Sequence, residues 1–327
     1  MKILIFEDQI YPSENLEGLK IAASASSTET NFIFIGKTEK GTNLNNKFLS
    51  SNDHINVIKE LLTADIAIAI PSKYFFLRIL SALKFLKFKS VFLGPGKVTK
   101  AIGSFKHPER GEFPKIKTFF KFYLLNTYYI ANDEEDKSYC SEALGYPLNR
   151  ILIKTLPKYL YINKKLCEGN IHKDSVGILF APTHRWLDVI PPLTQMLSKD
   201  NFVEKIKKMN AKILHSKHPE TKFLKLNSGV SDFSSNWDDV NILITDYSSI
   251  GDDFINSGGK KLIYFTEDQN IFENNQGVGK FFKDSLQKGS TCINEEELIK
   301  KIMQHISNGN EYIIKPINYE RYFETLF

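Results

Sequence analysis

The sequence predicts an α/β protein with two Rossmann-like domains that face a cleft. Short runs of β-branched and aromatic residues alternate with longer amphipathic segments along the chain, which is typical of parallel strands joined by crossover helices. The length of 327 residues exceeds what one hydrophobic core usually organises, so two domains are expected. The hydrophobic content of 42% and the charged content of 25% are those of an ordinary soluble globular protein.

The first half of the chain shows this alternation from its beginning. Five apolar segments predict strands, at residues 2–6, 31–35, 65–70, 90–93 and 127–131. Three segments between them have helical periodicity, at residues 17–25, 54–62 and 74–85. The alternation favours a parallel sheet with crossover helices.

The second half repeats the pattern. Four further strands are predicted, at residues 176–181, 212–216, 241–245 and 261–265. Residues 295–306 predict an amphipathic helix that Asn294 caps, with Glu297 at the position of a capping box. Residues 156–173 contain Pro157, several lysines and Gly169 and show little periodicity, so we interpret them as the linker between two halves.

These elements divide the chain into three parts. Residues 1–160 are expected to form an N-terminal Rossmann-like domain and residues 161–310 a C-terminal one. Residues 311–327 form a C-terminal segment that is expected to pack back on the N-terminal domain, with a helix over residues 319–327.

Composition excludes several classes of protein. The net charge of +5 is too small and too dispersed to indicate nucleic-acid binding. The three cysteines are odd in number and widely spaced, which fits a reducing compartment and gives neither a disulfide framework nor a zinc-ligand pattern. No apolar run reaches the roughly 20 residues that span a bilayer, and the run at residues 2–6 is too short for a signal peptide. We therefore expect a cytoplasmic protein.

Polar sequences follow three successive predicted strands of the second half. They are Ala-Pro-Thr-His-Arg at 181–185, His-Ser-Lys-His-Pro at 215–219 and Thr-Asp-Tyr-Ser-Ser at 245–249. Ligands of α/β proteins bind at the carboxyl ends of parallel strands. A helix that begins near Ser248 and Ser249 would offer free N–H groups and about half a positive charge to a phosphate. The alternative is that Asp246 or Ser248 only caps that helix.

These motifs together resemble a known family. Residues 180–185, Lys217-His218-Pro219 and residues 244–254 are similar to the strand-end, His-Pro and Thr-Asp-Tyr-Ser-Ser motifs of the CDP-glycerol glycerophosphotransferases. That family comprises teichoic-acid primases and polymerases, with relatives among capsule polymerases. Its motif includes an aspartate four residues after the second serine, which here is Asp253.

The resemblance implies a glycosyltransferase-B fold and a bacterial transferase that works without a metal or other cofactor. The donor would be a CDP-activated alcohol, glycerol phosphate or ribitol phosphate, held by the C-terminal domain, and the acceptor a lipid-linked or growing cell-surface glycan or polymer on the side of the N-terminal domain. His218 would contact the donor phosphates, Ser248 and Ser249 would hold the diphosphate, and Arg185 would add positive charge as the nucleotide leaves. The implied catalytic residues are His184, Arg185 and His218, and the implied donor-binding residues are Thr183, His218, Pro219, Thr245, Asp246, Ser248, Ser249 and Asp253.

The sequence departs from the family in the first half. The family carries a His-Gly-Thr-Pro-x-Lys loop whose histidine is the expected general base, and the best counterpart here is the stretch at 94–103. The histidine position falls on Pro95, which cannot take a proton, so either the alignment of this loop is wrong, another residue serves as the base, or the chemistry differs. The cleft loop on the acceptor side would be formed by Gly94, Pro95, Gly96 and Lys100. Other candidates for the base are His107, His184, Glu7 and Asp8.

Two other functions stay open for this reason. One is a glycosyltransferase that uses a CMP- or UDP-linked sugar donor to build capsule, lipopolysaccharide or another surface glycan. The other is a nucleotide-binding or assembly subunit without catalysis. Product analysis distinguishes them, because a phosphodiester, a glycosidic bond and no product are three different results.

Lysines alternate with aromatic residues at 84–89 and 115–125. Such a surface could make peripheral contact with the inner face of the membrane, each lysine contributing about 1 kcal/mol. The alternative is a buried helix whose lysine stems extend to the surface. No RNA-binding module is recognisable, so no nucleic-acid partner is expected.

Four further residues have simpler interpretations. Adjacent carboxylates on a helix point about 100° apart, so Asp252 and Asp253 do not suggest a metal pair, and Asp252 is expected on a solvated helix face. Trp186 and Trp237 are expected to pack in the interior rather than to stack on a base.

Overall fold

The computed structural model describes most of the chain as two compact units. The described residues are 1–6, 14–26, 30–36, 47–50, 53–69, 89–93, 127–169, 175–183, 185, 189–216, 226–275, 277, 282–308, 314–320 and 322–324. Unit 1 comprises those up to Tyr161 and those from Asn318 onward, and unit 2 comprises those between Ile162 and Ile317.

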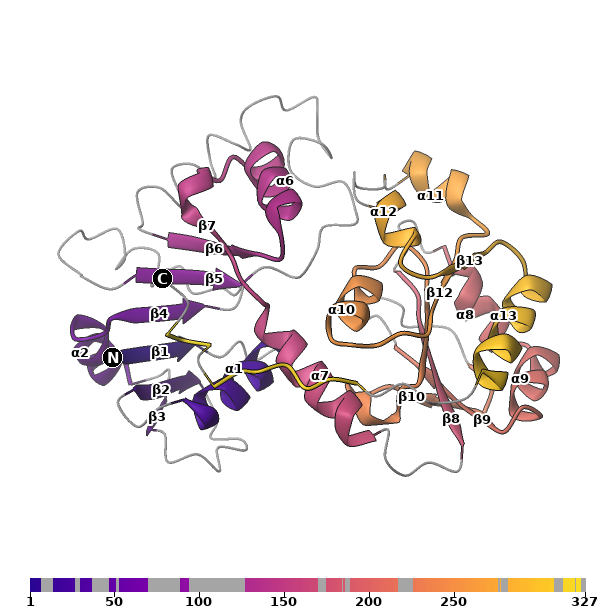
Figure 1. Cartoon of the computed structure of the whole chain (residues 1–327), viewed down its shortest axis with the longest axis horizontal. Helices are drawn as coiled ribbons and strands as arrows, with labels where there is room; N and C mark the ends of the chain where they lie inside the picture. Colours follow the sequence, from indigo (N-terminus) through magenta and orange to yellow (C-terminus); the bar gives the residue numbers. More distant parts are fainter. Residues whose placement is uncertain are drawn as a thin grey trace. The chain divides into compact units, whose positions relative to one another are not determined.

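Unit 1 is built on a seven-stranded parallel sheet with the order β3-β2-β1-β4-β5-β6-β7 (Figure 1). Its strands are β1 (Lys2–Phe6), β2 (Asn31–Gly36), β3 (Lys47–Ser50), β4 (Ile66–Ala69), β5 (Lys89–Leu93), β6 (Thr127–Ala131) and β7 (Ile151–Ile153). Its described helices are α1 (Glu14–Ala25), α2 (His54–Leu62) and α6 (Glu134–Leu144), with a short 3-10 turn, η2 (Leu148–Arg150). The order places β1 in the interior and reverses direction between β1 and β4, as in a doubly wound Rossmann sheet.

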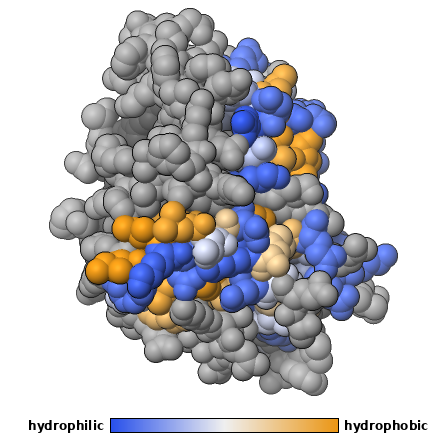
Figure 2. Space-filling view, turned by 90° about the vertical axis from the view of Figure 1, so that its left-hand side faces the viewer, coloured by the Kyte–Doolittle hydropathy of each residue, from blue (hydrophilic) through white to orange (hydrophobic). Residues whose placement is uncertain are grey.

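Burial explains why the central strands of unit 1 lack alternation. Ile3, Leu4 and Ile5 are fully buried, because helices cover both faces of a parallel sheet. The outer face of α2, in contrast, carries exposed apolar side chains, since Ile55 and Leu62 are 70% and 61% exposed. Figure 2 views the molecule from this side and shows hydrophobic and hydrophilic residues next to one another.

Unit 2 repeats the same topology on a six-stranded parallel sheet with the order β10-β9-β8-β11-β12-β13. Its strands are β8 (Val176–Ala181), β9 (Ala211–His215), β10 (Val230–Asp232), β11 (Ile242–Thr245), β12 (Leu262–Phe265) and β13 (Ser290–Cys292). The chain moves outward from β8 through β9 to β10 and then returns to the other side of β8 at β11. The strand order therefore reverses between β8 and β11, which is the point where such sheets bind ligands.

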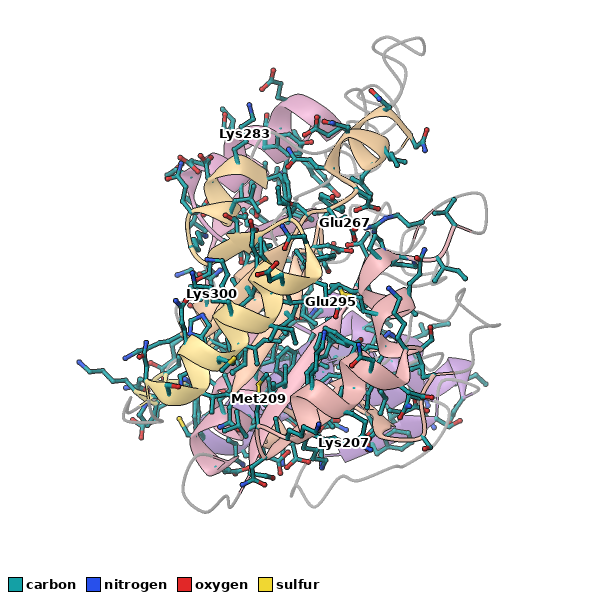
Figure 3. All side chains as sticks on the ribbon, turned by 90° about the vertical axis from the view of Figure 1, so that its right-hand side faces the viewer. Lys207, Met209, Glu267, Lys283, Glu295 and Lys300 are labelled. Atoms are coloured by element: carbon teal, nitrogen blue, oxygen red, sulfur yellow. The ribbon has the colours of Figure 1, made fainter. Side chains whose placement is uncertain are left out.

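Helices cover the sheet of unit 2 on both faces. They are α8 (Pro192–Leu197), α9 (Asp200–Lys207), α10 (Ile250–Asn256), α11 (Gln269–Asn275), α12 (Phe282–Leu286) and α13 (Glu295–Ser307), with the 3-10 turn η3 (Trp237–Asp239). Figure 3 looks onto α9 and α13, whose Lys207, Glu295 and Lys300 lie on the outer surface. Their inner faces bury Phe202, Leu298 and Ile302 against the strands in one continuous core. As predicted, Asn294 caps α13 by accepting from the Glu297 N–H at 2.9 Å.

The predicted linker is a helix, α7 (Pro157–Gly169), and the division between the two units falls inside it. Proline at the first helical position is favourable because its missing N–H has no intrahelical partner there. The buried side chains of Leu160, Ile162 and Leu166 give α7 an apolar face. The sequence did not show that the segment is helical, because the lysines between these positions obscured the period.

The C-terminal residues do not form the predicted helix in the described part of the segment. Residues 314–319 are irregular, and residues 322–324 form a turn. Phe323 packs on Phe32 of β2 with ring centroids 4.7 Å apart, and Tyr322 Oη donates to the Thr155 carbonyl at 3.0 Å. The predicted helix at 74–85 and the lysine-rich segments at 84–89 and 115–125 lie outside the described residues, except for Lys89 at the start of β5.

Candidate functional site

The candidate site lies where β8, β11 and β12 end in unit 2. These strands are neighbours in the sheet, and β8 and β11 flank its switch point. The loop after β8 supplies Thr183 and Arg185, the loop after β11 supplies residues 246–249, and the loop after β12 supplies Asp268. The position alone favours a ligand site, because the crevice outside the carboxyl ends of strands at a switch point is open in this fold.

Arg185 is the centre of a buried charged cluster. Its Nε donates to Asp268 Oδ2 at 2.9 Å, and its Nη2 donates to Asp246 Oδ2 at 2.9 Å. Nη2 also donates to Asp268 Oδ1 at 3.1 Å, and Nη1 donates to the Thr183 carbonyl oxygen at 2.7 Å. Burial disfavours the charged form, but the two carboxylates outweigh it, and the pKa of Arg185 lies above its usual value. The guanidinium is therefore a permanent cation enclosed by protein groups.

Two aromatic rings lie against this cluster. The Arg185 Cζ atom is 4.9 Å from the Tyr247 ring centroid and 4.8 Å from that of Phe272 on α11, and the two rings stack 3.9 Å apart. Tyr247 Oη donates to Asp268 Oδ1 at 2.9 Å. Burial, reinforced by the nearby Asp268 charge, raises the pKa of Tyr247, so its hydroxyl remains a donor at neutral pH.

Thr245 and Asp246 join the loop after β11 to the loop after β8. Thr245 is fully buried, and its Oγ1 donates to the Ala181 carbonyl oxygen at 2.7 Å. Asp246 Oδ1 accepts from the N–H groups of Thr183 at 2.8 Å and Tyr247 at 2.6 Å. The carboxylate of Asp246 thus holds the strand ends together, and it does not cap α10.

The turn at Ser248 and Ser249 leads directly into α10. Both serines are half-buried, and α10 begins at Ile250, close to the predicted start. The Ser249 side chain makes no capping bond, and Ser248 Oγ accepts only a long bond of 3.4 Å from the Ile250 N–H. Capping therefore leaves the Ser249 hydroxyl available.

Thr183 carries a second available hydroxyl at the end of β8. The residue is 3% exposed, and its Oγ1 has no hydrogen-bond partner among the described residues. A buried hydroxyl without a partner costs about 1–3 kcal/mol, which a ligand or water at this position would recover.

The first turn of α10 corrects one expectation. Asp252 is fully buried rather than solvated, because its carboxylate accepts from Ser285 Oγ and Lys288 Nζ, each at 2.6 Å. Asp253 is also buried, at 5% exposure. Gly251 lies against the Tyr264 hydroxyl, which a Cβ atom would approach to 2.4 Å, so a larger residue would push the start of α10 away from β12.

Of the residues singled out in the sequence, the structure brings Thr183, Arg185 and Asp246 into direct contact and places Ser248 and Ser249 next to them in the chain. Several others lie outside the described residues: Gly94, Pro95, Gly96, Lys100, His184, His218 and Pro219. β9, whose end precedes His218, is the neighbour of β8. Sequence reasoning missed Asp268, Phe272 and the role of Tyr247, although the acidic Glu267-Asp268 pair just after a strand was a usable signal.

Two features are absent from the described residues. No group of three or more histidine, cysteine or acidic side chains within them could hold a metal ion. Among the helices in the described ranges, none is both long enough and apolar enough to pass through a bilayer.

Two doubly wound parallel units, one of them with a polar cluster at its switch point, are the features of an α/β protein with a glycosyltransferase-B-like fold. The family model of CDP-glycerol:poly(glycerophosphate) glycerophosphotransferases matches residues 11–324. The chain belongs to this family. It is thus a transferase of the glycerophosphotransferase type, and both the resemblance and the fold class expected from the sequence are confirmed.

Solved structures show the same fold. The chain is similar to the wall teichoic acid polymerase TagF, with a TM-score of 0.67 and 14% identity over 98% of this chain and 85% of that one, for a TagF variant soaked with CDPG. A second TagF structure gives a TM-score of 0.64 and 14% identity, over 97% of this chain and 85% of that one. UDP-GlcNAc 2-epimerase from Methanocaldococcus jannaschii gives a TM-score of 0.56 and 15% identity, over 100% of this chain and 99% of that one. No curated protein sequence matches the chain.

Proposed function

We propose that this protein transfers glycerol phosphate or ribitol phosphate from a CDP-activated donor to a lipid-linked or cell-surface polymer acceptor. The observation that carries the proposal is the family match over residues 11–324. The polar loops at the switch point of unit 2 support it as the donor site. The reaction is proposed to need no metal and to take place at the cytoplasmic face of the membrane.

In the proposed reaction, an acceptor hydroxyl attacks the phosphorus of the alcohol phosphate. A phosphodiester bond forms, the bond from that phosphorus to the CMP oxygen breaks, and the hydroxyl proton passes to a base. Fixed donors contribute most where the leaving nucleotide gains charge. We assign this role to the hydroxyls of Thr183, Ser248 and Ser249, and to His218 as a contact of the donor phosphates. His184 is a candidate for the base.

Replacing Ser249 by alanine is expected to weaken donor binding about 10- to 150-fold. The reason is the loss of a hydrogen bond to a charged group, which contributes about 1.5–3 kcal/mol. Calorimetric titration of CDP-glycerol into the purified variant measures the effect. Ser231→Ala is the matched control, because Ser231 is exposed on the edge strand β10. Donor affinity equal to that of the unmodified protein would remove Ser249 from the site.

Thermal unfolding in the presence of CDP, CMP, UDP, GDP and CDP-glycerol, with and without EDTA, tests the donor class. A ligand at 100 times its dissociation constant should stabilise the protein by about 2.7 kcal/mol. We expect stabilisation selective for the cytidine nucleotides and insensitive to EDTA. Stabilisation that EDTA abolishes would contradict the metal-independent reaction, and selectivity for UDP or GDP would contradict a CDP-linked donor.

A second candidate function is sugar transfer from a CMP- or UDP-linked donor. The specific observation in its favour is Pro95, which stands where the family has its basic histidine. Incubation with radiolabelled CDP-glycerol or with a CMP- or UDP-sugar, followed by analysis of the bond formed, separates the two reactions. A phosphodiester supports alcohol-phosphate transfer and a glycosidic bond supports sugar transfer.

A further inference from the structure

We propose that Asp268 is a positioning residue of the donor site, and this inference rests on the proposed function of that site. Asp268 lies three residues after the end of β12, in the loop before α11. Its carboxylate binds Arg185 through both oxygens and also accepts from Tyr247 Oη. A single side chain thus connects the loop after β12 to residues in the loops after β8 and β11.

The contacts of Arg185 indicate why a positioning role fits better than direct contact with the donor. Hydrogen bonds to Asp246, Asp268 and the Thr183 carbonyl use all three nitrogens of the guanidinium. Two carboxylates more than balance its single positive charge, and two aromatic rings lie beside it. The cation therefore acts on the donor through the loops it holds.

Those loops carry the hydroxyls assigned to the donor. Thr183, whose carbonyl Arg185 holds, presents the buried hydroxyl that lacks a partner in the described part of the chain. Tyr247, whose hydroxyl Asp268 holds, directly precedes Ser248 and Ser249. Without Asp268, Arg185 would keep Asp246 as its one carboxylate partner among the described residues, and Tyr247 Oη would lose its hydrogen bond to Asp268. Both sets of hydroxyls would then lose part of their support.

The test compares Asp268→Asn and Tyr247→Phe, separately and together. Asparagine keeps the shape but removes the charge, and phenylalanine keeps the stacking on Phe272 while removing only the hydroxyl. The dissociation constant for CDP is measured calorimetrically well below the melting temperature of each variant, and kcat and KM are measured with CDP-glycerol. We expect Asp268→Asn to weaken CDP binding about 10-fold and to lower kcat/KM by up to about 100-fold, since small displacements of positioning groups have effects of this size.

The coupling between the two substitutions distinguishes a positioning role of Asp268 from a general loss of stability. If Asp268 acts partly through Tyr247, then Tyr247→Phe weakens CDP binding in the unmodified protein and has a smaller effect when Asp268→Asn is already present. Asp239→Asn is the control: Asp239 pairs with Lys212 at 2.9 Å and lies before β11, at the amino end of the strand, so CDP affinity should not change.

Three results would overturn the proposal. They are unchanged CDP affinity in Asp268→Asn, fully additive effects of the two substitutions, and an equal loss of affinity in Asp239→Asn. If Asp268→Asn does not fold, unchanged CDP affinity in Tyr247→Phe overturns it instead.

If the unmodified protein binds UDP and not CDP, the proposed donor is wrong, and titration of the same variants with UDP decides the role of Asp268. Absence of binding to either nucleotide overturns both proposals.

Discussion

Arg185→Met is expected to lower the free energy of unfolding by about 3–5 kcal/mol. Removing one partner of a buried ion pair leaves the other charge in the interior without compensation, and losses of this size are typical. Here two carboxylates, Asp246 and Asp268, would lose their shared cation. Arg185 is only 4% exposed, so water would not readily replace it. Methionine is the suitable replacement because it fills much of the same volume without polar atoms. Denaturation by urea, monitored by circular dichroism, measures the change.

The reason for the loss can be tested by removing one of the carboxylate charges as well. The double variant Arg185→Met with Asp268→Asn should be less destabilised than Arg185→Met alone, since only one buried charge then lacks a partner. Lys212→Met is the matched control, because Lys212 and Asp239 form a pair whose lysine side chain is 46% exposed. Such surface pairs contribute about 0–1 kcal/mol. If Arg185→Met and Lys212→Met destabilised the protein equally, the buried cluster would not be a major source of stability.

The central strands could be predicted from the sequence because their physical environment is simple. β1, β6 and β8 begin and end where the sequence predicts. In β1 and β8 every residue after the first is buried, as expected for strands that are covered on both faces. β3, β7, β10 and β13 were missed. They have three or four residues each and lie at the edges of the two sheets, so burial imposes little pattern on them. β10, for example, is the sequence Val-Ser-Asp with two exposed residues.

The positions of the site loops followed from the sequence, but the contacts between them did not. Polar residues after β8 and β11 could be recognised because those strands are strongly apolar and the residues after them are not. The sequence could not show that Thr245 uses its hydroxyl on the Ala181 carbonyl oxygen, or that Asp246 binds the Thr183 N–H. Those contacts depend on β8 and β11 being neighbours, which is a property of the strand order. Asp268 joins the cluster for the same reason, since β12 lies beside β11.

Trp237→Ala is the second substitution with a large expected effect, a loss of about 3–5 kcal/mol in the free energy of unfolding. Trp237 is fully buried in η3, just before β11. Its ring stacks on Phe254 of α10 with centroids 6.2 Å apart and meets Phe233 edge-on at 5.3 Å. The expectation that Trp237 packs in the interior is confirmed by this burial. Alanine would leave a large cavity beneath α10, which the surrounding strands can fill only in part.

Because α10 follows the Ser248–Ser249 turn, a shift of α10 into this cavity should also disturb the donor site. Trp237→Ala is expected to weaken CDP binding as well as stability, whereas Trp237→Phe, which keeps an aromatic ring against Phe254, should lose less stability and keep most of the affinity. Melting curves and calorimetric titration of both variants with CDP make the comparison. A ring that stacked on the nucleotide base would behave differently, since Trp237→Phe would then weaken CDP binding with little change in melting temperature. That result would place Trp237 in the binding site and reject the packing role, whereas parallel losses of stability and affinity would tie the geometry of the serine turn to the core beneath α10.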